Sequence, residues 1–195
     1  MNELKNKIIC ESLKLFSLKG FLSTSLNHIL EAANTSKGGF YNHFKSKEDL
    51  FFAVMREARR SWRERNLVGL AETEKPVEKI KTLLHNFKDR YLKDIETFPG
   101  GCIFVTLSVE LDDQRPHLAG EIKEGFVRLK AMINRLLNQG KASGEIRDEI
   151  DTEAVTEMIF AGMIGASVIF GIEKSFDGLD QSINPLITYL ERLAP

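Results

Sequence analysis

The stretch from Thr24 to Leu50 constrains the fold of this chain more than any other part of its sequence. It reads TSLNHILEAANTSKGGFYNHFKSKEDL. Its first apolar residues recur at the i, i+3, i+4 and i+7 spacing of one helix face. A hydroxyl at Ser23 or Thr24 can cap that helix, and Asn34 tolerates the left-handed backbone of a sharp turn. The pattern therefore predicts a short helix, a tight turn and a second short helix capped by Ser36. The apolar positions of the first helix are Leu26, Ile29, Leu30 and Ala33.

The second short helix opens with Gly38 and Gly39, each of which costs a helix about 1 kcal/mol relative to alanine. Close approach of the backbone to a large anionic partner explains this cost, since a side chain would hold phosphates away. We expect Phe40 and Phe44 to point into the core. The exposed side then carries Lys37, Tyr41, Asn42 and His43, which offer the donors, acceptors and cation used against phosphates and base edges.

Ser46-Lys47-Glu48-Asp49 has the form of a third helix start, with carboxylates at the positive end of the helix dipole. The whole stretch is a helix-turn-helix pattern. Together with Gly20-Phe21 before it, residues 5–50 closely resemble the DNA-binding domain of TetR-type transcriptional regulators. The residues that carry the resemblance are Gly20, Phe21, Thr24, Ser25, Ile29, Ala33, Ser36, Lys37, Gly38, Tyr41, His43, Phe44, Lys47, Glu48 and Leu50. The sequence departs from the family pattern at Asn34, where the turn glycine is usual, and at Thr35, where an aliphatic residue is usual.

The resemblance implies which residues touch DNA. Lys37 and Tyr41 are expected in or beside the major groove, and His43 and Lys47 on phosphates. Thr24 and Ser25 are expected on the flanking backbone. The full set implied by the motif is Thr24, Ser25, Ser36, Lys37, Gly38, Tyr41, His43 and Lys47.

Charge is distributed unevenly along the chain. Residues 1–65 carry 12 Lys and Arg against 7 Asp and Glu, a net charge of +5, whereas the remainder is at −6. A basic N-terminal third on an acidic body suits a protein that meets DNA at one end. We predict an all-α protein of about nine helices. Residues 1–48 form the helix-turn-helix domain, and residues 49–195 form a helical domain for effector binding and dimerisation.

Amphipathic periodicity predicts the helices outside the motif. The first spans residues 2–19, with Ile9, Leu13 and Phe16 on its apolar face and Ser12 on its inner side, and Gly20 ends it. Further helices are expected at 47–70, 77–95, 102–111, 118–139, 154–171 and 179–193. The segment 102–111 is apolar enough for a buried strand, but its helical surroundings favour a helix.

The helix at 154–171 is apolar nearly all round, so it must be buried on most sides. Its apolar run from Met158 to Ile172 is too short to span a bilayer. In the family, two C-terminal helices of this kind pair with their copies, so the resemblance implies a homodimer and a palindromic operator. The interface is expected at Ile159, Gly162, Met163, Ala166, Ile169, Ile183, Leu186, Ile187 and Leu190. The alternative is that this helix is the central core helix of a monomer.

Effector binding is the second half of the family's usual mechanism: a small molecule favours the state that does not fit DNA. Aromatic and aliphatic residues of the body make a pocket for an apolar or aromatic molecule plausible, although each one also suits a plain core. The candidates are Trp62, Phe87, Tyr91, Phe98, Cys102, Phe104 and Phe126. Cys102, beside two glycines at a helix start, could instead be a reactive thiol, which would make the protein a redox or electrophile sensor. Cys10 is expected to pack.

Other function classes find little support in the sequence. The four histidines are scattered, and no spacing suggests a metal. An acidic group at Glu110, Asp112 and Asp113 could hold a cation but reads better as a solvated loop. No P-loop, Rossmann fingerprint or nucleophile elbow occurs. The sequence therefore predicts no catalytic residue, no metal, no cofactor and no membrane partner, in a cytoplasmic protein. A helical small-molecule carrier or enzyme remains the alternative outside DNA binding.

Overall fold

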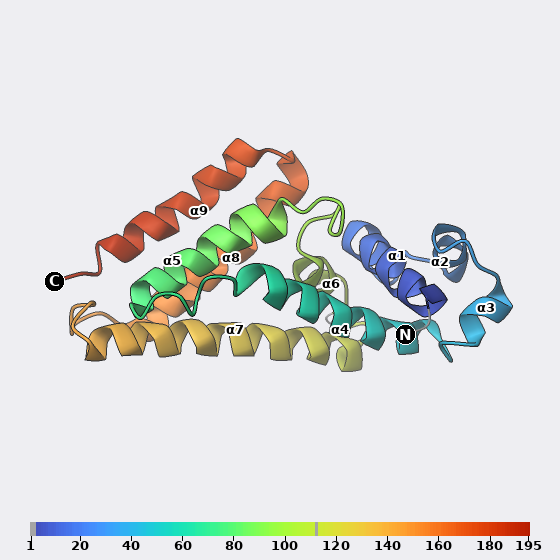
Figure 1. Ribbon diagram of the computed structural model, residues 1–195, viewed down its shortest axis with the longest axis horizontal. Helices are drawn as coiled ribbons and strands as arrows, with labels where there is room; N and C mark the ends of the chain where they lie inside the picture. Colours follow the sequence, from blue (N-terminus) through green and yellow to red (C-terminus); the bar gives the residue numbers. More distant parts are fainter. Residues whose placement is uncertain (1–2, 112) are drawn as a thin grey trace. The chain divides into compact units, whose positions relative to one another are not determined.

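The computed structural model describes residues 3–111 and 113–195, and within them every regular element is a helix. The all-α prediction is therefore confirmed. Along the chain (Figure 1) the elements are α1 (Glu3–Lys19), α2 (Leu26–Ala32), α3 (Lys37–Tyr41), α4 (Lys47–Asn66), α5 (Pro76–Asn86), a π-helix (Phe87–Leu92), α6 (Ile103–Leu111), α7 (Pro116–Ala142), α8 (Thr152–Glu173) and α9 (Phe176–Glu191).

The chain divides into two compact units. The first comprises residues up to Trp62 together with Asp94–Ile122, and the second comprises Arg63–Lys93 together with Lys123–Pro195. Helices α4 and α7 each contribute residues to both units. The predicted domain boundary at residue 48 stays a prediction.

In the first unit, α6 packs along α1. The segment just before α6 also approaches α1 closely, because a Cβ on Gly100 would lie 1.8 Å from the carbonyl oxygen of Ser17. Three rings tie α1, the following loop and α4 together: Phe21 makes edge contacts with Phe16 at 5.4 Å and with Phe51 at 5.2 Å between ring centroids. The α6 segment that could have been a strand is thus a helix, as expected.

The inner face of α1 is rotated slightly from the prediction. Ser12, Leu13 and Phe16 are buried as expected, but Ile8 is fully buried where Ile9 was predicted. Gly20 ends the helix with φ of +80°, the left-handed conformation that was predicted for it.

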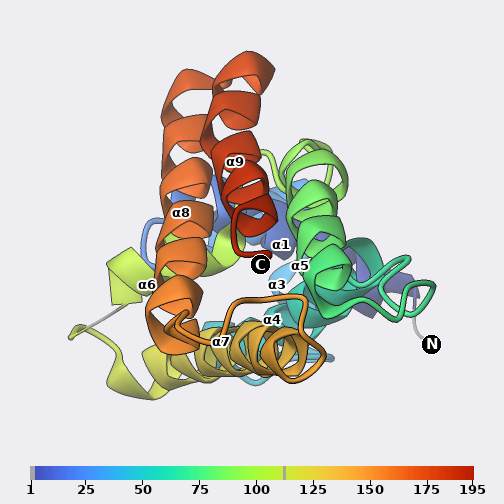
Figure 2. The ribbon, with the colours of Figure 1, turned by 90° about the vertical axis from the view of Figure 1, so that its left-hand side faces the viewer.

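In the second unit, α8 and α9 form an antiparallel pair, and α5 lies along α9 (Figure 2). The pair is close at Gly162, where a Cβ would lie 2.7 Å from the Leu186 side chain. Lys174 turns the chain between the two helices in the left-handed conformation, and Ser175 caps α9 by accepting from Gly178 N–H. The α7 and α8 helices meet through Phe126 and Phe160, with ring centroids 5.2 Å apart.

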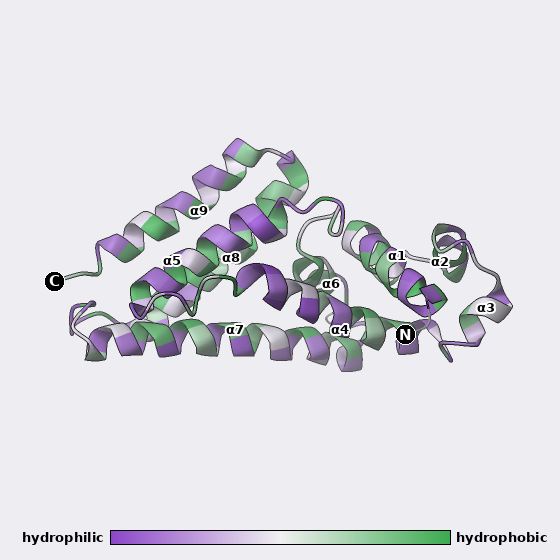
Figure 3. Ribbon diagram, in the orientation of Figure 1, coloured by the Kyte–Doolittle hydropathy of each residue, from purple (hydrophilic) through white to green (hydrophobic). Residues whose placement is uncertain are grey.

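Several helix ends differ from the predictions. Helix α4 ends at Asn66 rather than near residue 70, and α7 ends at Ala142 rather than at residue 139. Helix α8 is 22 residues long, so its apolar run belongs to a helix that is long and apolar enough to cross a membrane. A core helix of a globular protein can meet the same criterion. In Figure 3 the visible turns of α8 are mostly green, the colour of apolar residues.

Candidate nucleic-acid interface

The helix caps and the turn of the α2–α3 segment are formed by interactions between residues close in sequence. Ser25 caps α2: its Oγ accepts from His28 N–H at 3.1 Å, and His28 Nδ1 accepts from Ser25 N–H at 3.2 Å. Asn34 takes the left-handed conformation with φ of 49°, as its place in the turn predicted. Ser36 caps α3 by accepting from Gly39 N–H at 3.1 Å.

The predicted cap at Ser23 or Thr24 is wrong. The Thr24 side chain is fully buried and its hydroxyl donates to the Gly20 carbonyl at 2.6 Å. That hydroxyl is therefore committed to the protein interior. The predicted contact of the Thr24 side chain with the DNA backbone is corrected on the same ground.

Helix α3 has one apolar face and one polar face. Phe40 is fully buried and stacks at a tilt on the nearly buried Phe44, with centroids 5.6 Å apart. Tyr41 packs its ring edge-on against Phe40 yet leaves 56% of its surface exposed. The ring of Tyr41 is thus held from one side and presented on the other.

The structure presents most of the predicted DNA-facing residues on this polar side. Five of the eight are exposed, namely Ser25, Ser36, Lys37, Gly38 and Tyr41, and His43 is half-exposed. Asn42 and Lys45 are exposed beside them. The exposed set offers one amide, two lysine ammonium groups, hydroxyls and an imidazole, the groups that bind phosphate oxygens and base edges.

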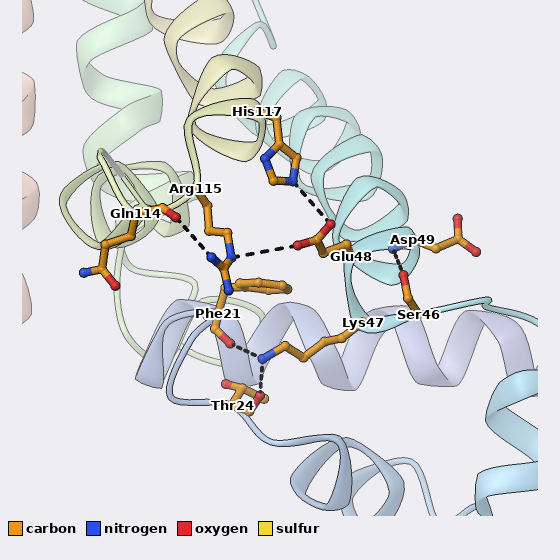
Figure 4. Close-up of polar contacts among 9 residues, drawn as sticks. All are labelled: Phe21, Thr24, Ser46, Lys47, Glu48, Asp49, Gln114, Arg115 and His117. Atoms are coloured by element: carbon orange, nitrogen blue, oxygen red, sulfur yellow. Dashed lines mark hydrogen bonds and ion pairs between the residues drawn. The ribbon is translucent and has the colours of Figure 1, made fainter.

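Lys47 is directed inward instead (Figure 4). Its Nζ donates to the carbonyl oxygens of Phe21 at 2.8 Å and of Thr24 at 2.9 Å, and it lies 4.3 Å from the centre of the Phe21 ring. Burial lowers the pKa of this ammonium, and the carboxylate of Glu110 acts in the opposite direction. Two of its three N–H groups are thus used inside the protein, and the predicted contact of Lys47 with phosphate stays a prediction.

Glu110 of α6 is the residue whose role the sequence did not indicate. Its Oε2 accepts from Phe21 N–H at 2.6 Å and its Oε1 accepts from Leu22 N–H at 2.9 Å. It serves the loop before α2 rather than the cation site considered for it. Asp112, the second member of that acidic group, lies outside the described residues. The signal in the sequence was an acidic residue in an otherwise apolar helix.

Glu48 joins the start of α4 to the start of α7. His117 Nε2 lies 3.2 Å from Glu48 Oε2, and Arg115 Nε lies 3.9 Å from Glu48 Oε1 (Figure 4). All three side chains are largely exposed, so this pairing adds little to stability. Ser46 caps α4 as expected, by accepting from Asp49 N–H at 3.0 Å. Asp49 accepts from Lys45 N–H.

The seven predicted effector-pocket residues are divided between the two units. Phe87 and Tyr91 of the second unit stack with centroids 5.8 Å apart, and Phe126 of that unit packs on Phe160. The first unit holds the other four, Trp62, Phe98, Cys102 and Phe104. The pocket itself stays a prediction.

The cysteines differ in exposure. Cys102 is 6% exposed and immediately precedes α6, where its carbonyl accepts from Val105 and Thr106 N–H. Cys10 is exposed, so its predicted packing role is wrong. Partial desolvation, followed by the charges of Glu57 and Glu11, raises the pKa of the Cys10 thiol.

The predicted dimer interface needs correction at five of its nine positions. Ile159, Met163, Ala166, Ile183 and Leu190 are each at most 1% exposed, so they are buried within the subunit, in which α8 packs on α9 and α9 packs on α5. Ile169 is 40% exposed, and Gly162, Leu186 and Ile187 are intermediate. The large apolar residues of α8 that remain exposed are Met158, Val168, Ile169 and Ile172, and a Cβ on Gly165 would meet nothing within 4 Å.

An all-helical chain with a capped helix-turn-helix and an exposed polar second helix defines a helix-turn-helix DNA-binding protein. Residues 8–54 match the family described as "Bacterial regulatory proteins, tetR family", and residues 76–184 match "Tetracyclin repressor-like, C-terminal domain". The chain belongs to the TetR family of transcriptional regulators.

Relatives and solved structures agree along nearly the whole chain. An HTH-type transcriptional regulator of Lactococcus lactis is 33% identical over 191 residues, covering 97% of this chain and 94% of the relative. The HTH-type transcriptional repressor DhaR of Mycobacterium sp. strain GP1 is 26% identical over 178 residues, covering 91% and 87%. The crystal structure of a TetR transcriptional regulator from Chloroflexus aurantiacus superposes with a TM-score of 0.88 at 31% identity, covering 96% and 94%.

Proposed function

We propose that this protein is a ligand-responsive repressor of the cytoplasm that binds a palindromic operator as a homodimer and is released by a small molecule. The observation that carries DNA binding is α3, whose apolar face is buried through Phe40 while Lys37, Gly38 and Tyr41 stay exposed. Repression follows the function printed for the relative DhaR. Dimerisation and effector release follow the family resemblance.

The proposed DNA contacts are divided by chemistry. Lys37 and Tyr41 meet base edges in the major groove, and Ser25, Ser36 and His43 meet the phosphates on either side. Gly38 allows the α3 backbone to come close. A second subunit places its own α3 about 34 Å away, one helical turn along the duplex, or at a multiple of that distance.

The effector is proposed to be an apolar or aromatic molecule bound in the helical body by residues from the aromatic set. A thiol sensor at Cys102 is less well supported, because the residue is 6% exposed and an oxidant needs access to sulfur. The effector release is a shift between two states that bind DNA differently.

Tyr41→Ala tests the DNA-binding face. The operator is first selected from genomic fragments with the purified protein, and its affinity is then measured by fluorescence anisotropy. Loss of one specific major-groove contact costs about 1–3 kcal/mol, so operator affinity should fall about 5- to 150-fold. Affinity for unrelated DNA should change little, and sedimentation should show an unchanged assembly.

The outcome that contradicts the proposal is operator affinity equal to that of the wild type in folded Tyr41→Ala. Phe176→Ala is a matched control, since it also truncates an exposed aromatic ring, 48% exposed, but on α9. When its concentration is counted as assembled protein, the operator affinity of Phe176→Ala should match that of the wild type.

A further inference from the structure

The loop Gly20–Thr24, which leads from α1 into α2, is held by two charged side chains from distant parts of the first unit. Glu110 of α6 accepts from the N–H groups of Phe21 and Leu22 at 2.6 and 2.9 Å. Lys47, the first residue of α4, donates to the carbonyl oxygens of Phe21 and Thr24 at 2.8 and 2.9 Å. The N–H of Phe21 is therefore bonded to a carboxylate, and the carbonyl of the same residue is bonded to an ammonium group.

This arrangement, the Phe21 clamp, consists of Glu110, Lys47 and the loop Gly20–Thr24. A carboxylate only accepts and an ammonium only donates, so each matches the backbone groups that it meets. Hydrogen bonds to ionised groups are about twice as strong as neutral ones. The clamp therefore fixes the direction in which the chain enters α2.

Gly20 is required by the clamp as well as by the helix end. Its φ of +80° belongs to the left-handed region, and a Cβ at this position would lie 2.4 Å from Glu110 Oε1. The Phe21 ring is held too, by Phe16 and Phe51 on its edges and by Lys47 Nζ at 4.3 Å from its centre. The backbone and the side chain of Phe21 are thus fixed by three helices of the same unit, α1, α4 and α6.

We propose that Glu110 and Lys47 are positioning residues, which set how α2 and α3 are presented to DNA without touching the DNA themselves. The proposal rests on the proposed function, since it concerns the geometry of operator binding. Glu110 acts through the loop and α2, and its carboxylate is needed for its shape as an acceptor. Lys47 acts through the same loop from the opposite side.

The clamp and simple electrostatics predict opposite results for Glu110→Gln. Removing a negative charge should by itself tighten binding to DNA. In the clamp, glutamine offers only one acceptor oxygen and turns an NH₂ group toward a second N–H donor. We therefore expect operator affinity to fall at least tenfold and the ratio of operator to unrelated-DNA affinity to fall with it.

Lys47→Met separates positioning from phosphate contact. Loss of one phosphate contact lowers the slope of log affinity against log salt by about 0.9. A positioning lysine should lower operator affinity with that slope unchanged. A slope that falls by about one contact would overturn the assignment of Lys47.

Two further variants keep the test independent of stability and charge. Glu121→Gln makes the same charge change in the same unit and breaks the ion pair of Glu121 with Arg59, 2.5 Å apart, but leaves the loop alone. Its operator affinity should not fall. Glu110→Asp keeps the charge and withdraws the oxygens by one methylene, so it should weaken operator binding as Glu110→Gln does. It also serves if Glu110→Gln does not fold.

Amide hydrogen exchange measures the protection of the clamped N–H groups in the absence of DNA. Exchange at Phe21 and Leu22 should accelerate in Glu110→Gln and stay unchanged in Glu121→Gln. Unchanged exchange, or faster exchange with operator affinity at or above that of the wild type, would overturn the proposal. If wild-type protein binds no selected DNA above the level of unrelated DNA, the proposed function fails and the clamp proposal fails with it.

Discussion

Lys88 is a cation inside the second unit, with 8% of its surface exposed. It lies on the π-helix, 2.7 Å from Asp180 Oδ1 and 3.2 Å from Asn184 Oδ1, both on α9. A buried ammonium without partners is costly, and both partners of Lys88 lie on α9. The contacts of Lys88 with Asp180 and Asn184 therefore fix how α9 packs on this segment. The hydrogen bond from Lys88 lowers the pKa of Asp180, and the charges of Lys88 and Lys93 act in the same direction.

This residue pair gives stability a defined pH dependence. Because the folded-state pKa of Asp180 is lowered, its contribution is present above the ordinary carboxyl pKa of about 3.9 and is lost as pH falls through the folded-state value. Asp180→Asn should therefore lower the Tm at pH 7, and the difference from wild type should narrow below about pH 4. Melting followed by circular dichroism across pH 3–7 measures it.

Asp148→Asn is the control for this series, because Asp148 is an exposed carboxylate in the connector before α8. Its Tm should follow the wild type at every pH. An Asp180→Asn deficit that is the same at pH 3 and pH 7 would show that lost packing, not the ionised pair, is responsible.

At the scale of single helices, periodicity and caps predicted most of the first unit. Helical spacing placed Phe40, Phe44 and Ser12 inward, and Asn34 and Gly20 adopt the left-handed conformations expected of them. These features depend on a few adjacent residues. The helix-turn-helix could therefore be predicted because its determinants are local.

The errors come where a residue's partner lies elsewhere in the chain. Thr24 could cap α2 as well as Ser25 by sequence, and what decides is the Gly20 carbonyl that takes its hydroxyl. Lys47 is bonded to carbonyls of a loop 23 and 26 residues away, and Glu110 to amides 88 and 89 residues away. No spacing rule reaches that far, so the exposed half of the site was predictable and the clamp was not.

Helix α3 allows a test of why its first turn contains glycine. A Cβ on Gly38 would meet only Ser36 Oγ, at 3.7 Å, an ordinary contact. In the free protein Gly38→Ala should therefore raise stability, by up to about 1 kcal/mol from helix propensity. On DNA the added methyl group occupies the space of the backbone approach, so operator affinity should fall about tenfold.

The two effects of Gly38→Ala have opposite signs, which excludes general damage as their cause. Urea unfolding measures the first effect and operator titration the second. Gly125→Ala on α7 is the control, since a Cβ there has no neighbour within 4 Å. It should gain stability with unchanged operator affinity. Equal operator affinity in Gly38→Ala would remove the close-approach explanation of this glycine.

At the scale of the whole molecule, the open face of α8 is the surface on which we expect two copies to pair. Met158, Ala161, Gly165, Val168 and Ile172 are spaced alternately by three and four residues, the spacing of a helix–helix seam. Four of them are exposed, Ile172 by 78%, and a Cβ on Gly165 would meet nothing within 4 Å. Periodicity cannot tell which side of an all-apolar helix α9 covers, so five of the predicted interface residues are buried within the subunit. Where two copies meet stays a prediction.

Gly165→Leu distinguishes a monomer from a dimer paired through this seam. In a lone subunit the leucine occupies open space and replaces a helix-interior glycine, so the Tm should rise at every protein concentration. In a dimer it separates two helices that need a small residue for close approach. We expect at least a tenfold weaker association in sedimentation velocity and a Tm that depends more strongly on protein concentration. At equal total protein concentration, the variant should also bind the full palindrome more weakly than the wild type does.

Gly120→Leu on α7 is the matched control, because its Cβ also meets nothing within 4 Å, and its association should equal that of the wild type. If Gly165→Leu associates like the wild type and melts higher, this face of α8 is not where two copies meet, and the operator must be read by another arrangement.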